Sequence, residues 1–416
     1  MSRPTRILLA LLAGLLGGIL IARWGEAARV GILIAQPVGT AWLNALQMTV
    51  IPLVVSLLVT GVASTAEAAS AGKLAARTIV GTLVLLVLNG TVAALLTPLI
   101  LNAVPIPVDA ARALRGALGG SPEVAAAPPI GELFAAIIPT NVFAAASNGA
   151  LLSLIVFTLV FAFALARIDA EGRALLIRLS AAIRDTMLVV VGWVLLLAPI
   201  GVFALAFLVG ARAGSAAFGA LVHYLLVISA VGVVVTIVAY LVVVAGARVP
   251  VAQFAKQALP AQIFAVSTQS SLATLPAMLK AVGAMGVPRG ASGVTLPLGV
   301  AMFRATQPAM NVAIAMYIGR WFGVEVSAGA VAAAVLVGTV TSLGSISLPS
   351  QITFFASVVP IASAMGVPLA PLGLLIAVET IPDIFRTLGN VTSNLALTAI
   401  VTRDQAADAV AEETLA

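Results

Sequence analysis

The sequence predicts an all-α polytopic membrane protein with eight transmembrane helices and two re-entrant helical hairpins. Of its 416 residues, 62% are hydrophobic and only 9% are charged. A soluble globular protein carries about 25% charged residues, so this chain could not cover its own surface in water. Apolar stretches long enough to span the roughly 30 Å hydrocarbon core also recur along the whole chain. Together these observations exclude an ordinary soluble protein.

The spanning segments follow one another along the chain. They are expected at residues 6–24, 38–65, 75–103, 134–166, 174–209, 215–246, 290–318 and 371–402. Several exceed the roughly 20 residues that span a bilayer, which predicts tilted or bent helices. The first apolar run, residues 7–21, follows Arg3 and Arg6 and also fits a signal peptide. No small-residue cleavage site follows it, so we expect a first helix that stays in the membrane.

Basic residues gather in short connections, which explains the net charge of +6 without a nucleic-acid partner. The connections that carry them include Lys73, Arg77, Arg167, Arg184, Arg248 and Lys256. By the positive-inside rule these loops face the cytoplasm. We therefore expect a protein of the plasma (inner) membrane with both termini in the cytoplasm.

The chain has no cysteine and a single histidine, His223. The absence of cysteine excludes disulfides, thiolate metal sites and cysteine nucleophiles. One histidine cannot form a histidine metal cluster, and we expect His223 to make an interhelical hydrogen bond. No cofactor and no metal centre are predicted.

Two regions do not resemble simple spans. Residues 251–286 form two short apolar arms around the polar tip 267–271, and residues 329–368 surround a second polar tip at 341–350. Non-helical backbone at membrane depth must be buried in protein or line a cavity. Two hairpins whose half-helix amino termini face an anion fit this pattern. The alternative is two ordinary helices kinked by Ser and Gly.

The last span carries polar residues on one narrow face of the predicted helix, spaced three or four residues apart. They are Glu379, Asp383, Arg386, Asn390 and Asn394, with Thr387 at the edge. Each ionisable group at this depth costs about 2.5–3.5 kcal/mol on insertion scales, and such groups normally mark a substrate or ion path. A structural pair of Asp383 with Arg386 is the competing interpretation.

An amino acid would supply charges that match this face. Its ammonium needs an acid such as Asp383, and a side-chain carboxylate suits the fork of Arg386. Its α-carboxylate suits the Ser-rich tips. The sequence thus predicts a secondary transporter of a small anionic solute.

A further charge, Arg304, lies within the segment 290–318. Pro308 should kink or break this helix and free carbonyls that Arg304 or a cation could use. The alternative is an arginine that snorkels to the membrane interface.

Several motifs of the chain resemble, in order, those of the dicarboxylate/amino acid:cation symporter family of the glutamate-transporter type. They lie at residues 48–54, 138–143, 198–205, 267–276, 296–299 and 383–392. The resemblance implies a homotrimer whose protomers each combine a scaffold with a mobile transport domain that moves as an elevator.

The resemblance also implies a division of the chain. The scaffold would comprise 1–70 and 106–213. The transport domain would comprise 71–105, 214–250, the hairpin 251–289, the helix 290–324, the hairpin 325–370 and the helix 371–403, followed by a cytoplasmic tail, 404–416.

By position, the resemblance makes Asp383 the ammonium ligand and Arg386 the ligand of the side-chain carboxylate. Thr387 and Asn390 become polar neighbours, with Asn390 near the α-carboxylate, and Ser271 a hairpin-tip contact. The remaining expected substrate contacts are Ser270, Gln307, Ser347 and Pro349. Retention of both Asp383 and Arg386 matches the family pattern for aspartate or glutamate.

Departures from the family motifs are equally informative. Phe303 and Ala305 replace the sodium-binding Asn and Asp of the seventh helix, and Asn394 replaces a sodium-binding aspartate of the eighth. Gln307 replaces a Thr, and Leu85 and Leu86 stand where third-helix hydroxyl ligands are expected. The second tip has Ser347 and Pro349 where glycines are usual.

These changes predict degraded sodium sites. Arg304 would act as a permanent internal cation, with coupling to protons through Glu379 or Asp383, or no cation coupling. A sodium site built from backbone carbonyls of the second hairpin stays open.

Other functions remain open from the sequence. A carrier of a dicarboxylate or another amino acid, still coupled to sodium, fits the altered tips, although Asp383 would repel a second carboxylate. An intramembrane hydrolase would need a carboxylate facing Asp383, and Glu379 lies on the same helix. A receptor would need a sizeable soluble output domain, and none is visible in the sequence. We therefore expect a transporter and not an enzyme.

Overall fold

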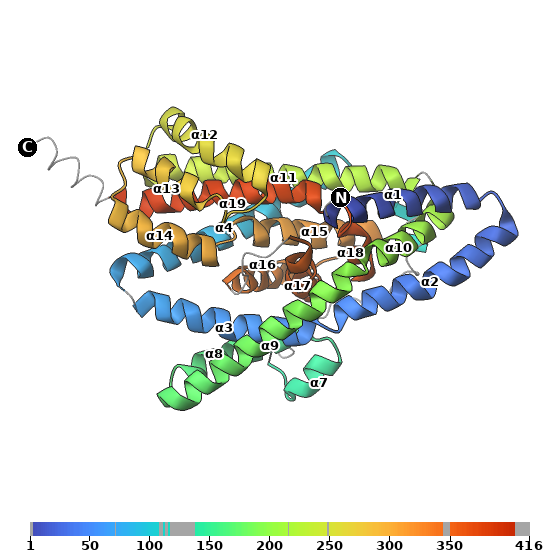
Figure 1. The fold of residues 1–416 in the computed structure, drawn as a ribbon, viewed down its shortest axis with the longest axis horizontal. Coiled ribbons are helices and arrows are strands. Elements are labelled where there is room, and N and C mark those ends of the chain that lie inside the picture. The colour runs from blue at the N-terminus through green and yellow to red at the C-terminus, as the bar shows by residue number, and fades with distance from the viewer. Residues whose placement is uncertain are drawn as a thin grey trace, which may run out of the picture.

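The computed structural model describes residues 3–70, 72–107, 111–112, 115–116, 138–214, 216–247, 249–343 and 350–403. Within these residues the chain is helical and forms no strand (Figure 1). Four stretches are long and apolar enough to cross a membrane: 26–70, 73–103, 170–196 and 217–246. The predicted all-α class is confirmed.

The helices are numbered as in Figure 1. They are α1 (Arg3–Ile21), α2 (Gly25–Gln47), α3 (Val50–Ser70), α4 (Lys73–Ala103), α7 (Val142–Ser147), α8 (Leu151–Leu165), α9 (Ala170–Leu196), α10 (Ala198–Ala213), α11 (Ala216–Gly246), α12 (Val251–Thr268), α13 (Leu275–Ala284), α14 (Arg289–Met302), α15 (Thr306–Phe322), α16 (Ala328–Leu343), α17 (Ser350–Ala364), α18 (Ala370–Leu375) and α19 (Thr380–Val401).

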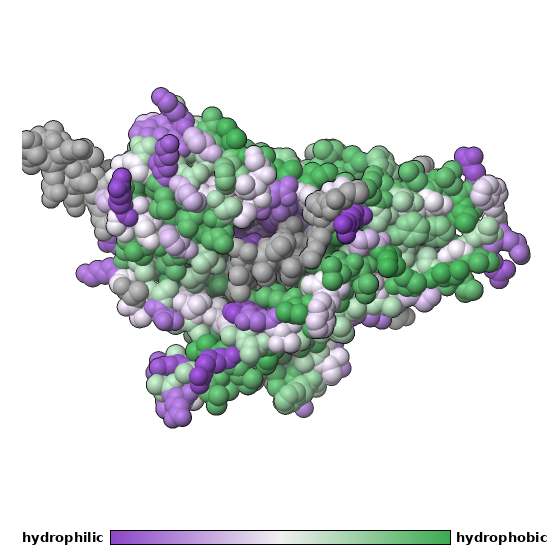
Figure 2. Space-filling model, in the orientation of Figure 1, coloured by the Kyte–Doolittle hydropathy of each residue, from purple (hydrophilic) through white to green (hydrophobic). Residues whose placement is uncertain are grey.

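The outer surface is apolar over much of its area. Figure 2 shows apolar residues over α1, α2 and α10, whereas hydrophilic residues gather mainly toward the two ends of the long axis. Large side chains such as Leu33 and Leu95 are exposed on the outside. Such a surface suits a lipid environment and would be unstable in water.

Helices α1 and α10 pack with their backbones in close contact. A Cβ on Gly14 would meet the carbonyl oxygen of Phe203, and one on Gly18 would meet that of Phe207. Small residues four apart allow this approach, which drives helix association where lipid removes the hydrophobic effect. Helix α2 packs on the same α10, and α3 packs against α8 and α9.

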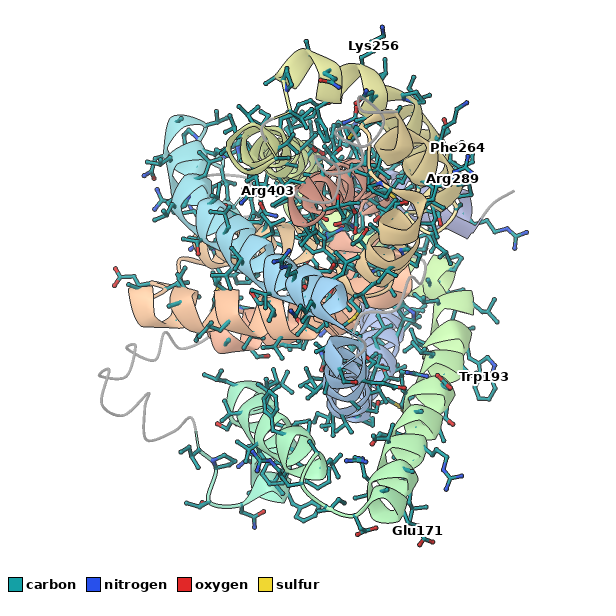
Figure 3. The ribbon with its side chains drawn as sticks, turned by 90° about the vertical axis from the view of Figure 1, so that its left-hand side faces the viewer. Glu171, Trp193, Lys256, Phe264, Arg289 and Arg403 are labelled. Carbon is teal, nitrogen blue, oxygen red and sulfur yellow. The ribbon has the colours of Figure 1, made fainter. Side chains whose placement is uncertain are left out.

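A second group of helices surrounds α19. Helices α11, α12 and α14 pack against it, and α15 packs against α4 and α16. Almost all of α15 is buried. Figure 3 shows this group, with Lys256 and Phe264 on α12, at one end of the view, and α9 with Glu171 and Trp193 at the other.

Both predicted hairpins are present as pairs of packed helices, α12 with α13 and α16 with α17. The alternative prediction, an ordinary helix with a kink, is therefore wrong for both regions. At the first tip Gln269 adopts a left-handed conformation with φ of 50°, which reverses the chain.

Five predicted single spans are interrupted: 134–166 is divided between α7 and α8, 371–402 is divided between α18 and α19, and three others are divided before a helix with proline in its first turn. Segment 38–65 is divided between α2 and α3, 174–209 between α9 and α10, and 290–318 between α14 and α15. In these three, the new helix carries its proline at Pro52, Pro199 or Pro308. The missing N–H costs nothing there, because first-turn N–H groups have no intrahelical partner. We predicted the break in segment 290–318 at Pro308. It lies instead at 303–305, because Pro308 is tolerated in the first turn of α15.

Candidate functional site

The polar face of the last span points into the protein. Asp383, Arg386, Thr387, Asn390 and Asn394 lie on α19 and are all buried. Glu379 stands directly before the first residue of α19 and is fully buried. All six side chains are buried, five of them on α19 and Glu379 in the turn that precedes it.

Arg386 is the centre of the buried charges. Its Nη2 donates to Glu379 Oε1 at 2.6 Å, and its Nη1 donates to Asn311 Oδ1 at 3.1 Å. Its Nε lies 3.9 Å from Asp383 Oδ1. The structural pair that we considered, Asp383 with Arg386, is thus the longer contact, because the turn before α19 brings Glu379 back toward the guanidinium.

The neighbours of Arg386 come from several helices. The hydroxyl of Tyr224 on α11 donates to Glu379 Oε2 at 3.3 Å. Asn311 on α15 donates through Nδ2 to Ser357 Oγ on α17 at 2.9 Å. The sequence interpretation missed Tyr224, Asn311 and Ser357. Polar residues isolated in the apolar runs of three helices are the signal that could have found them.

The break between α14 and α15 exposes carbonyls beside α19. Asn394 Nδ2 donates to the Phe303 carbonyl oxygen at 3.4 Å, and Asn89 Nδ2 on α4 donates to that of Ala305 at 3.2 Å. The break frees carbonyls, as predicted, but side-chain amides occupy them. Asn89 was not predicted, and Leu85 and Leu86, one turn earlier on α4, are buried apolar residues.

The amino terminus of α15 is capped from α19. Thr306 donates to Asn390 Oδ1 through its backbone N–H at 3.0 Å and through its hydroxyl at 2.9 Å. Its hydroxyl also lies 3.2 Å from the Arg386 carbonyl oxygen. Asn390 therefore satisfies donors that a helix start leaves open, and ties the break to the buried charges.

Arg304 lies in the break and is half-buried. Its guanidinium lies within electrostatic range of Asp383 and Arg386. The described site thus brings two carboxylates, Glu379 and Asp383, together with two guanidinium groups, for a net charge of zero. Among the described residues, the Nε2 of the neighbouring Gln307 is buried without a hydrogen-bond partner. It is a donor available to a bound molecule.

The hairpin tips are described only in part. Ser270 and Ser271 are half-buried at the tip of the first hairpin, where Ser270 Oγ accepts from the Ala273 N–H at 3.2 Å. Ser347 and Pro349 lie outside the described residues. His223 contacts Tyr317 Oη at 3.1 Å and the Val104 carbonyl oxygen at 2.9 Å, so its predicted interhelical hydrogen bond is confirmed.

A bundle of apolar helices that buries charged side chains in its interior defines a membrane protein with a polar path or site. The chain belongs to the sodium:dicarboxylate symporter family, whose match covers residues 4–404. The resemblance drawn from the motifs is confirmed. Members of this family are transporters, so the protein is a transporter and not an enzyme, and the hydrolase and receptor alternatives are excluded.

The relatives share the full length of the chain. The protein is 29% identical over 408 residues to the proton/sodium-glutamate symport protein of Bacillus subtilis, covering 95% of this chain and 91% of the relative. It is 27% identical to the proton/glutamate-aspartate symporter of Escherichia coli, covering 97% and 92%. It is 25% identical to a C4-dicarboxylate transport protein of Rhizobium etli, covering 96% and 88%.

Proposed function

We propose that this protein is a secondary active transporter of aspartate or glutamate. The observation that carries the proposal is the buried Arg386, which Glu379 and Asn311 hold next to Asp383. Two of the relatives are named as glutamate or glutamate–aspartate symporters. The substrate's side-chain carboxylate would bind Arg386 and its ammonium would bind Asp383.

The other predicted contacts complete this binding mode. The free donor of Gln307 suits a carboxylate oxygen of the substrate. The α-carboxylate would lie against Ser270 and Ser271 of the first tip, with Thr387 and Asn390 beside it.

A C4-dicarboxylate is the second candidate, because a relative of comparable coverage carries that name. Asp383 favours the amino acid, since a carboxylate in place of the ammonium would face a buried like charge. The discriminating experiment is competition against labelled L-aspartate uptake by excess unlabelled aspartate, glutamate or succinate. We expect aspartate and glutamate to compete and succinate not to. Succinate competition without aspartate competition would identify a dicarboxylate carrier.

We also propose that the helix break no longer binds sodium. Sodium prefers hard oxygen ligands with carboxylate charge, whereas here amide N–H groups of Asn89 and Asn394 already donate to the freed carbonyls. Phe303 and Ala305 carry no ligand atom in their side chains. Arg304 adds a positive charge within electrostatic range of Asp383. These three features support the loss of a sodium site at this break.

We propose proton coupling because Glu379 and the substrate carboxylate would compete for the guanidinium of Arg386. While Glu379 is ionised, it holds the guanidinium through its 2.6 Å ion pair. A proton on Glu379 would weaken this pair and release Arg386 for the substrate carboxylate, so that proton and anion bind together. Asp383 is the other candidate carrier, although its proposed role with the ammonium requires its charge.

The packing supports an elevator in which two parts of the chain move against each other. Helices α1, α2, α3, α8, α9 and α10 contact mainly one another, and the helices around α19 form the other group. We propose that the first group is the scaffold of a homotrimer in the plasma membrane, with both termini in the cytoplasm. The second group would carry the substrate.

A further inference from the structure

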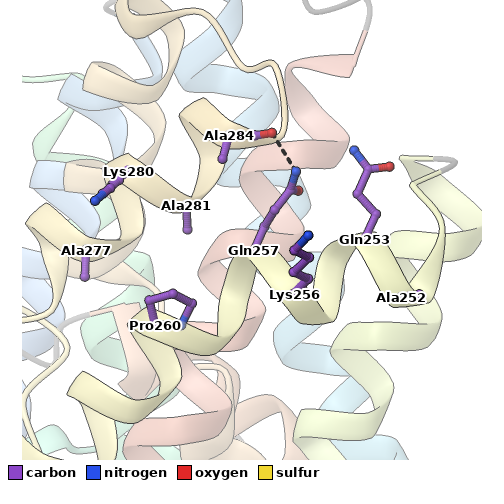
Figure 4. Close-up of a pocket in the computed structure, with 9 residues that line it drawn as sticks. All are labelled: Ala252, Gln253, Lys256, Gln257, Pro260, Ala277, Lys280, Ala281 and Ala284. Carbon is purple, nitrogen blue, oxygen red and sulfur yellow. Dashed lines mark hydrogen bonds between the residues drawn. The ribbon is translucent and has the colours of Figure 1, made fainter.

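A groove outside the substrate site runs between the two arms of the first hairpin. It encloses about 690 Å³ between α12 and α13 (Figure 4). From α13 the lining residues are alanines, Ala277, Ala281 and Ala284, apart from Lys280. Because alanine ends at Cβ, this face of α13 leaves space that a larger side chain would fill.

The open end of the groove is held together by one side chain. Gln257 Nε2 on α12 donates to the carbonyl oxygen of Ala284, the last residue of α13, at 2.6 Å (Figure 4). This bond joins the two arms at the end opposite the tip. The groove is thus built from both helices of the hairpin.

Two ammonium groups flank this groove. Lys256 and Lys280 are the only charged residues that line it, and no acid is among the lining residues. Within the described parts of the chain neither ammonium has an ion pair or hydrogen bond. The sequence contains only three lysines, and the third, Lys73, begins α4. Two of the three lysines of the chain therefore line one groove, which has no acidic residue in its lining to neutralise them.

The surroundings of the lysines are those of a membrane interface. Lys256 is the sixth residue of α12, about 7 Å along its axis from the open end at 1.5 Å per residue. Further toward the tip, Leu259, Ile263 and Phe264 are exposed on the outer side of the same helix. Figure 3 shows Lys256 at the outer rim of the hairpin, with Phe264 further along it. Along α12, a cationic surface near the open end of the hairpin is thus followed by an apolar surface toward the tip.

We propose that this groove binds an anionic phospholipid. The phosphate of the headgroup lies between the ammonium groups of Lys256 and Lys280, which attract it as basic residues attract acidic lipids at a membrane surface. The glycerol and the first acyl methylenes cover Pro260, Ala277 and Ala281. The inference depends on the groove alone and not on which solute the protein carries.

Native mass spectrometry of the purified protein, with phosphatidylglycerol and phosphatidylcholine at equal concentration, tests this site. Wild type is expected to retain phosphatidylglycerol preferentially. Lys256→Gln and Lys280→Gln should each reduce that preference about fivefold, and the double variant should lose it. Lys256→Arg with Lys280→Arg should retain it, and Lys73→Gln is the matched control.

Shape is tested separately from charge. Ala281→Leu keeps both lysines but fills the groove, and it should also lose the preference. An unchanged preference in the lysine double variant would overturn the proposal. Displacement of the lipid by millimolar inorganic phosphate, with phosphate retained in its place, would also overturn it, since the site would then bind a free anion. Thermal unfolding of each variant in detergent confirms that it is folded.

Discussion

Two helix breaks of this protein have opposite surroundings. Between α9 and α10, the indole N–H of Trp42 donates to the Val194 carbonyl oxygen at 3.1 Å, and the ring lies against Gly201. Between α14 and α15, amides of Asn89 and Asn394 satisfy the carbonyls. The first break is filled by a large, mostly apolar side chain, and the second lies beside four charges.

The comparison shows that a proline-associated break is not by itself a binding site. Both breaks precede a helix with proline in its first turn, and both free backbone groups that must find partners. Of these two breaks, as far as the described residues show, it is the one at 303–305 that has charged groups beside it, namely Arg304, Glu379, Asp383 and Arg386. The side chains that satisfy the break decide whether it serves packing or transport.

The largest effect is expected at the charged break, from Arg386→Ala. Truncating one member of a buried charge pair costs about 2–5 kcal/mol, so acidic-substrate uptake should fall at least about 30-fold. Labelled L-aspartate uptake by proteoliposomes measures this. Arg403→Ala, which removes an exposed arginine after α19, is the control and should retain uptake. Equal uptake by Arg386→Ala and wild type would exclude Arg386 as the carboxylate ligand.

Arg304→Gln sharpens the comparison by removing the positive charge while keeping a polar side chain. The site would then hold two acids and one arginine, a net charge of −1, and aspartate uptake should fall about tenfold because an anion meets excess negative charge. Sodium should stimulate this variant more than wild type. If uptake and its sodium dependence are unchanged, Arg304 does not replace a cation.

Asn89→Ala should have an intermediate effect. It removes the donor to the Ala305 carbonyl oxygen, and a buried acceptor without a partner costs about 1–3 kcal/mol. We expect a lower unfolding temperature in detergent together with several-fold weaker uptake. Asn102→Ala, at the exposed end of the same α4, is the control. A loss of stability with full uptake would make Asn89 a packing residue only.

Trp42→Phe, at the uncharged break, should have the smallest effect on transport. It removes the hydrogen bond to Val194 but keeps most of the apolar ring, which costs about 1 kcal/mol. Unfolding should occur at a lower temperature, while initial uptake rates stay within about twofold. A transport defect as large as that of Arg304→Gln would contradict the distinction between the two breaks.

The sequence predicted most of the site because period and charge are visible in it. The spacing of Glu379, Asp383, Arg386, Asn390 and Asn394 defines one helix face whatever surrounds it. Their pairing was not predictable, since the ion pair of Arg386 with Glu379 spans seven residues and depends on the turn before α19.

Long-range contacts were the least predictable part of the fold. Asn89 and Tyr224 are single polar residues in apolar helices, and only the packing of α4 and α11 brings them to the site. The break at 303–305 was misplaced because proline blocks a helix interior but is tolerated in a first turn. The hairpins were predicted correctly, since short apolar arms around polar tips favour two packed helices over one continuous span.

The central claim is that Arg304 and the amides at the break have replaced sodium. Uptake of labelled L-aspartate into proteoliposomes tests it directly, with an inward sodium gradient, an inward proton gradient or neither. The account predicts accumulation driven by the proton gradient, or uptake independent of both gradients. Accumulation driven by sodium alone would contradict it.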